Sequence, residues 1–232
     1  MKRVILKISG EAIKGKSSIY NSLTVFRIAK EIIDIKKYGY QIGVVIGGGN
    51  ILRGSQAKEL GIMSVYADNI GMLATVQNAI VFSEVLITLG CRAKLFTSVQ
   101  MDKIAPIYTR KDADIALRDG YICFFAGGIG NPFFSTDTAT VMRAVELDAS
   151  LILKGTKVDG LFSCDPIKNS DAKFIESIKY DEVLSKRLRV MDMTAFSLAR
   201  ENNINIRTFN MRKSGNIKKA LIDETIGSLI HN

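Results

Sequence analysis

The sequence predicts an α/β protein, a three-layer αβα sandwich built around a mostly parallel, twisted sheet. Short apolar runs with strand spacing alternate with runs of helical spacing, which is typical of parallel sheets covered by helices. Apolar residues make up 47% of the 232 residues, enough to fill a large core. Only three prolines occur and no segment is of low complexity, so we expect one domain over residues 1–232.

The first part of the pattern pairs two buried strands with one helix. Residues 3–8 and 41–46 are nearly continuous apolar runs, as expected for strands covered on both faces. Between them, residues 23–38 have helical spacing, and Asn21 or Ser22 precedes them as an N-cap.

The middle of the chain continues the alternation. Residues 67–89 have the apolar spacing of a long helix, which Gly90 closes. A strand is predicted at 92–97, a short helix at 112–118, and a further strand at 121–125.

The last part begins with a helix at 137–147, for which Thr136 is the predicted N-cap. The remaining elements are a strand at 151–154, a helix at 192–201, a strand at 205–210 and a helix at 216–222.

The composition excludes several kinds of site. His231 is the single histidine, which argues against a Ser-His-Asp triad, a Cys-His dyad and a His-ligated metal. The three cysteines are odd in number and widely spaced, so we expect a reducing compartment, the cytoplasm. No run of about 18 apolar residues free of charge or glycine occurs, and we expect no membrane span.

The net charge of +9 could indicate nucleic acid. The basic residues are spread out, however, and their longest runs are pairs such as Lys36-Lys37 and Lys218-Lys219. We therefore do not expect nucleic acid, and favour either a solvated basic surface or a site for small phosphorylated anions.

The predicted strands end in residues suited to phosphate. In open α/β sheets, ligands bind beyond the carboxyl ends of the strands. Glycine there lets backbone N–H groups approach phosphate oxygens, and helix N-termini add positive partial charge. Four strand ends carry glycine, and two of these also carry lysine: 7–10, 47–49, 127–137 and 154–160. This pattern predicts two or more anion sites, as when one phosphorylated molecule passes a group to another.

One motif is a decoy. Residues 10–17 satisfy the P-loop pattern G-x-x-x-x-G-K-[ST] after a strand. A P-loop needs a helix opening at Lys16 and Ser17, but residues 17–22 read as a loop, and no other predicted strand ends in the aspartate that would hold Mg²⁺. We therefore set the P-loop interpretation aside.

At these strand ends the sequence resembles the amino-acid kinase superfamily and, within it, the bacterial uridylate kinases over essentially the whole chain. The matching stretches are 6–12, 43–50, 53–54, 67–75, 130–137, 154–160 with 165–166, and 190–196. The triple glycine alone indicates only the superfamily, whereas GNPFF–TD together with ADN–GM–AT is specific to uridylate kinases.

The resemblance implies an amino-acid kinase-like fold and transfer of the γ-phosphoryl of Mg·ATP to UMP, giving UDP and ADP. Mg²⁺ would be held through the ATP phosphates without a protein metal site. The part before about residue 150 would bind mainly the acceptor, and the part after it mainly ATP. Phosphoryl transfer needs positioning and charge neutralisation more than a covalent catalyst, which fits a chain with one histidine.

The resemblance also implies roles for individual residues. The catalytic residues would be Lys7, which meets the charge on the transferred group, Arg53, which binds phosphate, and Asp137, which aligns Lys7 without acting as a base. We expect these three to share one cavity. The ATP-binding residues would be Lys7, Ile8, Ser9, Gly10, Gly49, Arg53, Thr156, Phe162 and Asp165.

For UMP, Asp68 would accept hydrogen bonds from the ribose, and Asn131 and Thr136 would be polar readers of the base and phosphate. The UMP-binding residues would be Gly48, Asp68, Ile129, Gly130, Asn131, Pro132, Phe133, Phe134, Ser135 and Thr136.

Two departures from the family pattern bear on function. Ile129 stands where relatives commonly have threonine, so discrimination of uracil from cytosine could be relaxed. Residues 15–21 lack the glycine-rich composition of members activated by GTP, which weighs against that activation. The resemblance also implies a homohexamer and admits inhibition by UTP.

Two alternatives stay open. One is another superfamily kinase acting on a carboxylate or carbamate, such as acetylglutamate or aspartate, although the chain has no room for the regulatory domain usual in aspartate kinases. The other is a non-catalytic, nucleic-acid-binding regulator on the same fold, for which the +9 charge is the supporting feature.

Overall fold

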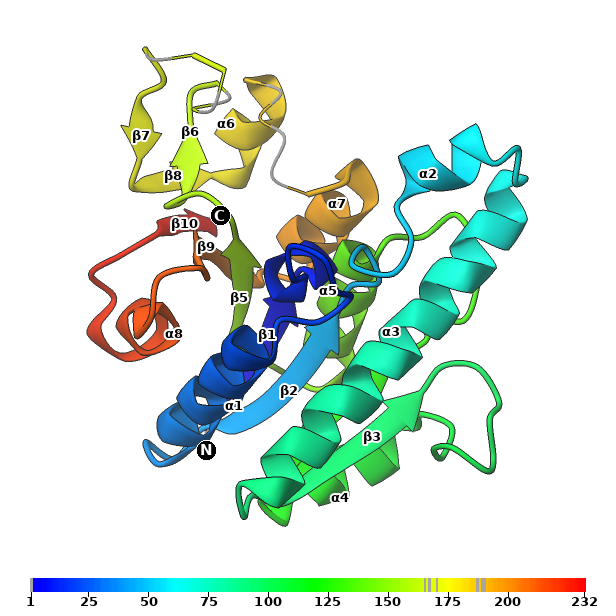
Figure 1. Ribbon diagram of the computed structural model, residues 1–232. Helices are drawn as coiled ribbons and strands as arrows, with labels where there is room; N and C mark the ends of the chain where they lie inside the picture. The colour runs from blue at the N-terminus through cyan, green and yellow to red at the C-terminus, as the bar shows by residue number, and fades with distance from the viewer. Residues whose placement is uncertain (1, 165, 167, 170, 187, 189–190) are drawn as a thin grey trace.

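A single large sheet forms the centre of the molecule in the computed structural model, which describes residues 2–164, 166, 168–169, 171–186, 188 and 191–232 (Figure 1). Within these residues its strand order is β3-β4-β2-β1-β5-β9-β10-β8. The predicted strands are all present: β1 (Arg3–Ile8), β2 (Gln41–Ile46), β3 (Ala93–Thr97), β4 (Ile122–Ala126), β5 (Leu151–Thr156) and β9 (Asn205–Asn210).

These six strands are parallel to one another, which confirms the predicted, mostly parallel sheet. β1 lies at the centre, between β2 and β5. The antiparallel pairing in this sheet is that of β9 with β10 (Ser228–His231), while β10 pairs with β8 (Ser177–Lys179) in parallel. Parallel order brings the carboxyl ends of β1, β2, β4 and β5 to one edge, where the glycine-rich segments follow.

Helices cover both faces of the sheet. On one face, α1 (Ser22–Lys36), α3 (Ser64–Thr88) and the pair α8 (Asn216–Lys218) and η2 (Lys219–Asp223) pack on alternate side chains of the strands. On the other face lie α4 (Arg110–Arg118), α5 (Thr136–Glu146) and α7 (Met193–Glu201). Side chains alternate along β1 accordingly: Leu6 and Ile8 face α1 and α3, whereas Ile5 faces α5.

Several short elements were not predicted, because a run of two to six residues carries too little periodicity. They are η1 (Gly10–Ile13), α2 (Gly54–Glu59), β6 (Leu161–Phe162), β7 (Phe174–Ile175), β8, α6 (Tyr180–Ser185) and β10. β6 and β7 form an antiparallel ribbon that, with β8 and α6, makes a small lobe beside the carboxyl end of β5 (Figure 1).

The predicted N-cap of α5 was wrong. Ser135, not Thr136, precedes the helix in extended backbone, and its Oγ accepts hydrogen bonds from the N–H groups of Asp137 and Thr138. Both residues can cap a helix, so only the backbone path decides between them. For α1, Asn21 is the cap and accepts from the N–H of Thr24. The segment 14–21 is a loop and α1 begins at Ser22, so no helix opens at the position a P-loop requires.

By length and composition alone, α3 could cross a membrane. It packs against α1, β3 and β4 through Val76, Ala79, Phe82 and Leu86, all buried in the core. We therefore interpret α3 as a core helix of this fold.

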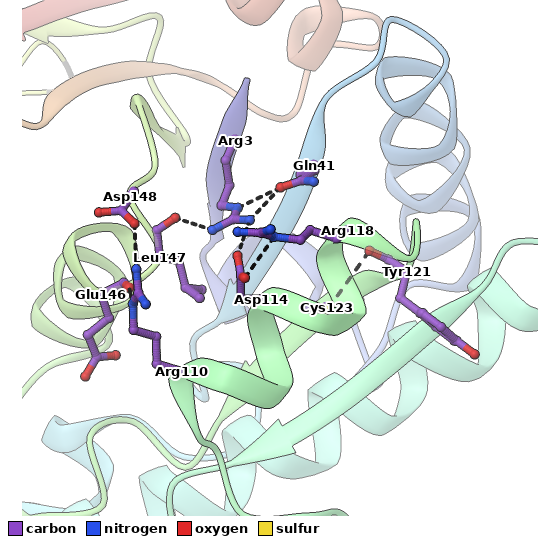
Figure 2. A network of polar contacts seen from close by, with 10 residues as sticks. All are labelled: Arg3, Gln41, Arg110, Asp114, Arg118, Tyr121, Cys123, Glu146, Leu147 and Asp148. Atoms are coloured by element: carbon purple, nitrogen blue, oxygen red, sulfur yellow. Dashed lines mark hydrogen bonds and ion pairs between the residues drawn. The ribbon is translucent and has the colours of Figure 1, made fainter. Parts of the chain in front are cut away.

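A polar cluster joins the elements at the amino ends of the strands, the edge opposite the glycine-rich segments (Figure 2). Arg3, at the start of β1, donates to Gln41 of β2, to the carbonyl of Leu147 after α5 and to Asp114 of α4. Asp114 also pairs with Arg118, 2.9 Å away. Arg3 thus connects β1 and β2 to α4 and to the residue that follows α5, at the edge of the sheet opposite the site described next.

Candidate active site

Three charged side chains meet at the carboxyl end of the sheet centre. Lys7 of β1 and Lys154 of β5 are register partners on adjacent parallel strands, so their side chains project from the same face. Asp137, in the first turn of α5, lies between them. Its Oδ1 is 3.0 Å from Nζ of Lys7, and its Oδ2 is 2.5 Å from Nζ of Lys154. All three side chains are at most 14% exposed.

Burial and charge act against each other in this cluster. Burial acts to raise the pKa of Asp137, but the two lysines outweigh it and hold that pKa below its ordinary value. Burial lowers the pKa of Lys154, and Asp137 partly opposes this. Asp137 thus lies between two buried ammonium groups, and the charge of Asp192 also acts to raise the pKa of Lys154. Two ammonium groups at the ends of adjacent strands are suited to contact an anion.

The glycine-rich segment after β2 lies against the turn after β1. A Cβ on Gly10 would come within 2.4 Å of the carbonyl oxygen of Gly47 and 2.7 Å of the nitrogen of Gly49. A Cβ on Gly48 would come within 2.7 Å of Cβ of Ala74 on α3. Glycine at positions 10 and 48 is therefore required by close packing, besides any contact with a ligand.

Buried polar side chains on α3 hold the glycine-rich segments in place. Nδ2 of Asn78 donates to the carbonyl of Gly47 at 2.8 Å and to Oδ1 of Asn50 at 2.7 Å. Asn50 donates back to Asn78, which also accepts from the hydroxyl of Tyr20. Thr75, also on α3, accepts from the N–H of Gly127 after β4. Helix α3 thus fixes the backbone that follows β2 and β4.

A first cavity of about 180 Å³, the α3-side cavity, lies between the glycine segment and α3. Seven of the residues predicted for the site line it: Gly48, Gly49, Arg53, Asp68, Asn131, Phe134 and Thr136. Asp68 accepts a hydrogen bond from the N–H of Phe133 at 2.7 Å, so its carboxylate also fixes the loop after β4.

A second cavity of about 320 Å³, the β5-side cavity, lies beyond the ends of β1 and β5. Lys7, Ser9 and Thr156 line it as predicted, together with Glu11, Lys154, Lys157 and Arg212. Five of these seven side chains are charged and four are cationic, as expected of a site for a polyanion.

The expected common cavity for Lys7, Arg53 and Asp137 was wrong. Lys7 lines the β5-side cavity and Arg53 lines the α3-side cavity, while Asp137 lies against Lys7. The two cavities are connected by an ion pair, because Nε of Arg53 is 3.0 Å from Oε1 of Glu11. The structure therefore has two adjoining cavities where the sequence suggested one.

Other predicted site residues lie outside the cavity walls. The side chain of Ile8 is fully buried in the core, so only its backbone could meet a ligand. Phe162 packs edge-on against Phe174 in the β6–β7 ribbon, with ring centres 5.5 Å apart. Phe133 is 73% exposed. Ser135 caps α5 and donates to Asp192.

Gly10 is held against the glycine segment, and Ile129, Gly130 and Pro132 lie in the loop after β4 without lining the α3-side cavity. Asp165 and Val190 are outside the described residues.

Sequence reasoning gave no role to several residues that the structure brings to the site: Lys154, Lys157, Arg212, Glu11, Asn78 and Thr75. Lys154 was noted as a strand-end lysine, but only the register of β5 with β1 pairs it with Lys7. Glu11, Asn78 and Thr75 carry no local signal, because their partners lie on other elements.

Among the described residues, no three His, Cys, Asp or Glu side chains are grouped to hold a metal ion. Asp137 faces the two lysines. A divalent cation would fit this site only if the ligand supplied most of its oxygens, as a polyphosphate does.

Comparison with known proteins gives a consistent result. The model of the amino acid kinase family matches residues 2–210. A uridylate kinase of Aliivibrio fischeri is 42% identical over 231 residues, which cover 99% of this chain and 95% of that protein. A uridylate kinase of Parabacteroides distasonis is 42% identical over 232 residues, covering 100% and 98%. The crystal structure of a UMP kinase from Bacillus anthracis superposes with a TM-score of 0.95 at 38% identity, covering 99% of this chain and 96% of that one.

Proposed function

This chain belongs to the amino acid kinase family and to the uridylate kinases within it, and from that membership we propose that it transfers the γ-phosphoryl group of ATP to UMP. A phosphate oxygen of UMP forms a new bond to the γ-phosphorus. The bond from that phosphorus to the β–γ bridging oxygen breaks, and UDP and ADP leave. This reaction supplies a nucleoside diphosphate for pyrimidine nucleotide synthesis.

The observation that carries the proposal is the Lys7–Asp137–Lys154 cluster beside two adjoining cavities. A phosphate monoester is already a good nucleophile near neutral pH, so the reaction needs no strong base. It needs cations on the moving group and donors on both ends. Asp137 holds the two ammonium groups in fixed positions at the ends of adjacent strands, where they would face oxygens of the transferred group. The cluster thus acts by electrostatics and position.

We assign ATP to the β5-side cavity. Lys7 and Lys154 would contact the transferred phosphoryl, and the backbone of Ile8, Ser9 and Gly10 would contact the other phosphates. Thr156, Phe162 and Asp165 remain our proposal for the adenosine end. Of the two that the structure describes, Thr156 lines this cavity, and its hydroxyl lies 2.7 Å from the carbonyl oxygen of Val158.

We assign UMP to the α3-side cavity. Asp68 would accept from the ribose, Asn131 and Thr136 would read the base and phosphate, and Gly48 would contact the phosphate. Gly49 and Arg53 were predicted for ATP, but they line this cavity, so we propose that they contact the phosphate of UMP instead. The other loop residues predicted for UMP would have to move toward the cavity, or act through their backbone. Under these assignments the described residues that line the UMP cavity all precede residue 150, whereas those that line the ATP cavity come from both parts of the chain. The proposed division at about residue 150 therefore applies to UMP more strictly than to ATP.

Mg²⁺ would be bound through the phosphate oxygens of ATP, where it supplies charge neutralisation when bound. The four cations that line the β5-side cavity would neutralise the remaining phosphate charge. No protein carboxylate needs to bind the ion directly.

The test is ADP release from Mg·ATP with a panel of acceptors: UMP, CMP, dUMP, AMP, acetylglutamate and aspartate. Turnover with UMP above the others supports the proposal. Turnover with acetylglutamate or aspartate instead would assign the chain to a carboxylate kinase. No turnover with any acceptor, together with tight DNA binding at physiological salt, would favour the regulatory alternative. Comparable rates with CMP would show that Ile129 relaxes base selection.

We further propose that the chain acts in the cytoplasm as a homo-oligomer, with the hexamer as its form. The exposed apolar side chains Tyr66, Leu73, Ile80 and Ile87 follow one another every seven residues on α3 and support an interface there. UTP carries the same uridine as UMP, so we expect it to compete for the α3-side cavity. We do not expect activation by GTP.

A further inference from the structure

An ion pair crosses from one cavity to the other. Glu11, on η1, lines the β5-side cavity, and Arg53, just before α2, lines the α3-side cavity. The contact joins Oε1 of Glu11 to Nε of Arg53 at 3.0 Å. The side chains are 40% and 48% exposed, so the pair adds little to folding stability. A pair that adds little to stability and lies between two ligand cavities is better explained by a role in ligand binding.

The chemistry of the guanidinium suggests that reason. An arginine carries five N–H donors in a rigid planar fork. Glu11 engages the Nε side of the fork, which leaves the two terminal amino groups for another anion. A half-exposed arginine otherwise samples many rotamers, and a ligand that orders it must offset that entropy. Because Glu11 already restricts the guanidinium of Arg53, less conformational entropy is lost when a ligand binds to it.

The backbone that carries Glu11 is closely packed. Gly10, the residue before Glu11, has no room for a Cβ beside the carbonyl of Gly47 and the nitrogen of Gly49, so the start of η1 packs directly on the glycine segment. Cγ of Glu11 lies 3.5 Å from the position that a Cβ of Gly49 would occupy. Glu11 thus starts from backbone that is held next to the segment lining the α3-side cavity.

From this geometry, and resting on the function proposed above, we propose that Glu11 is a positioning residue that reaches across from the ATP side and orients Arg53 toward the phosphate of UMP. Glu11 does not touch the acceptor itself. Its carboxylate faces a cavity assigned to a polyanion, where a negative charge disfavours binding. Glu11 therefore strengthens UMP binding through Arg53, whereas its charge either weakens ATP binding or leaves it unchanged.

The experiment compares Glu11→Ala and Glu11→Gln with the full-length wild-type chain in steady-state kinetics and in UMP binding by calorimetry. For Glu11→Ala we expect the KM and Kd for UMP to rise roughly 2- to 10-fold, the range for coupled side chains that are partly exposed. The KM for Mg·ATP should stay level or fall, and kcat should change less than the KM for UMP. Glu11→Gln should have a smaller effect, since its amide oxygen can still accept from Nε.

Glu182→Gln is the matched control, because Glu182 forms a similarly exposed pair with Lys186 on α6, outside both cavities. We expect its KM for UMP to equal that of the wild type. An equal rise in the KM for UMP and the KM for Mg·ATP in Glu11→Ala would show a merely structural role and overturn the inference.

A double-mutant cycle with Arg53→Ala isolates the route. If Glu11 acts through Arg53, Glu11→Ala has no further effect on UMP binding in the Arg53→Ala background. Additive effects would overturn the inference while leaving the proposed function intact. If the wild-type chain neither binds nor phosphorylates UMP, the proposed function fails, and this inference fails with it.

Discussion

At the scale of single residues, Asp137 decides how the site works. Its carboxylate lies where two polyanions are proposed to meet, and its negative charge would repel them. The position is favourable because the carboxylate pairs with two lysines. Its two oxygens each face a different lysine on neighbouring strands. Removing its charge would leave two buried ammonium groups repelling each other without a fixed position.

We therefore expect Asp137→Asn to lower kcat by about 100-fold or more, as for the loss of one preorganised electrostatic contact, with a much smaller change in UMP affinity. Initial rates and UMP calorimetry check this. Asp148→Asn, which alters an exposed pair with Arg110, is the control and should leave kcat unchanged. An unchanged kcat in Asp137→Asn would refute the organising role.

Lys154 leads to a prediction about pH. Burial lowers its pKa below 10.5, the ordinary value for lysine, so the free chain loses this ammonium at a lower pH than an exposed lysine would. The proposed reaction requires the charged form, so kcat/KM for Mg·ATP should fall on an alkaline limb that begins below pH 10.5.

In Lys154→Arg the charge persists at all these pH values, because the guanidinium does not lose its proton. Its activity will be lower, since the fork differs in shape, but the alkaline limb should move upward. If kcat/KM for Mg·ATP falls at the same pH in Lys154→Arg and in the wild type, a group other than Lys154 titrates at that pH. A pH–rate series from pH 7 to about 10.5 measures both profiles.

At the scale of elements, the two ends of the strands have different tasks. The carboxyl ends carry the site, and the amino ends carry the Arg3 cluster shown in Figure 2. Hydrogen bonding from Arg3, aided by Arg118, lowers the pKa of Asp114. A carboxylate with a lowered folded-state pKa contributes stability that is fully present above its ordinary pKa. That stability is lost as the pH falls through the folded-state value.

We expect Asp114→Asn to lower the free energy of unfolding by about 1 kcal/mol at pH 7, or roughly 2–4 °C in Tm for a chain of this size. The difference from the wild type should shrink as the pH falls through the lowered pKa. Thermal unfolding at pH 7 and in acid measures this. The rate with UMP should not change, since the cluster lies at the other edge of the sheet. A loss of activity without a loss of stability would contradict this division.

At the scale of the whole molecule, α3 connects core, site and surface. Its buried side packs on the sheet, Asn78 and Thr75 hold the glycine segments, and its outer side carries Tyr66, Leu73, Ile80 and Ile87. These four apolar side chains are 36–59% exposed and stand every two turns on one face. These four side chains form an apolar stripe in which the exposed residues Asn69, Gln77 and Glu84 stand between them. Large apolar side chains gathered on one exposed face suit an interface.

If the proposed oligomer uses this stripe, Ile87→Glu should dissociate it, because a buried interface does not accept an unpaired charge. Sedimentation velocity would show a shift to smaller species. Ile115→Glu, an exposed isoleucine on α4 away from the stripe, is the matched control. The same sedimentation coefficient for Ile87→Glu and the wild type would exclude the stripe as an interface.

The chain order of strands and helices could be predicted from sequence because it depends on local periodicity. The bounds of β1, β2 and β9 agree with those predicted, and the other ends agree or differ by at most three residues when α8 and η2 are taken together. The short elements could not be predicted, since η1, α2 and the β6–β7 ribbon depend on contacts with distant parts of the chain. Ser135 rather than Thr136 caps α5, which depends on the path of the loop.

For the site, residues near strand ends could be found because parallel strands bring those ends to one edge of the sheet. Lys7, Ser9, Asp137 and the glycines carry that signal along the chain. Glu11 and Asn78 do not, and Lys154 received no role until its register with Lys7 was known. Whether the site has one cavity or two was likewise beyond the sequence, because it depends on where Arg53 lies.

By itself, the sequence determined the fold class, the single histidine that argues against histidine-based sites, and the set of glycine and lysine strand ends, since these follow from composition and spacing. Only the tertiary structure decided that two lysines share one aspartate, that a glutamate links two cavities, and that α3 holds both glycine segments. Each of these is a contact between residues far apart in the chain, and such contacts exist only once the strands are in register and the helices are packed.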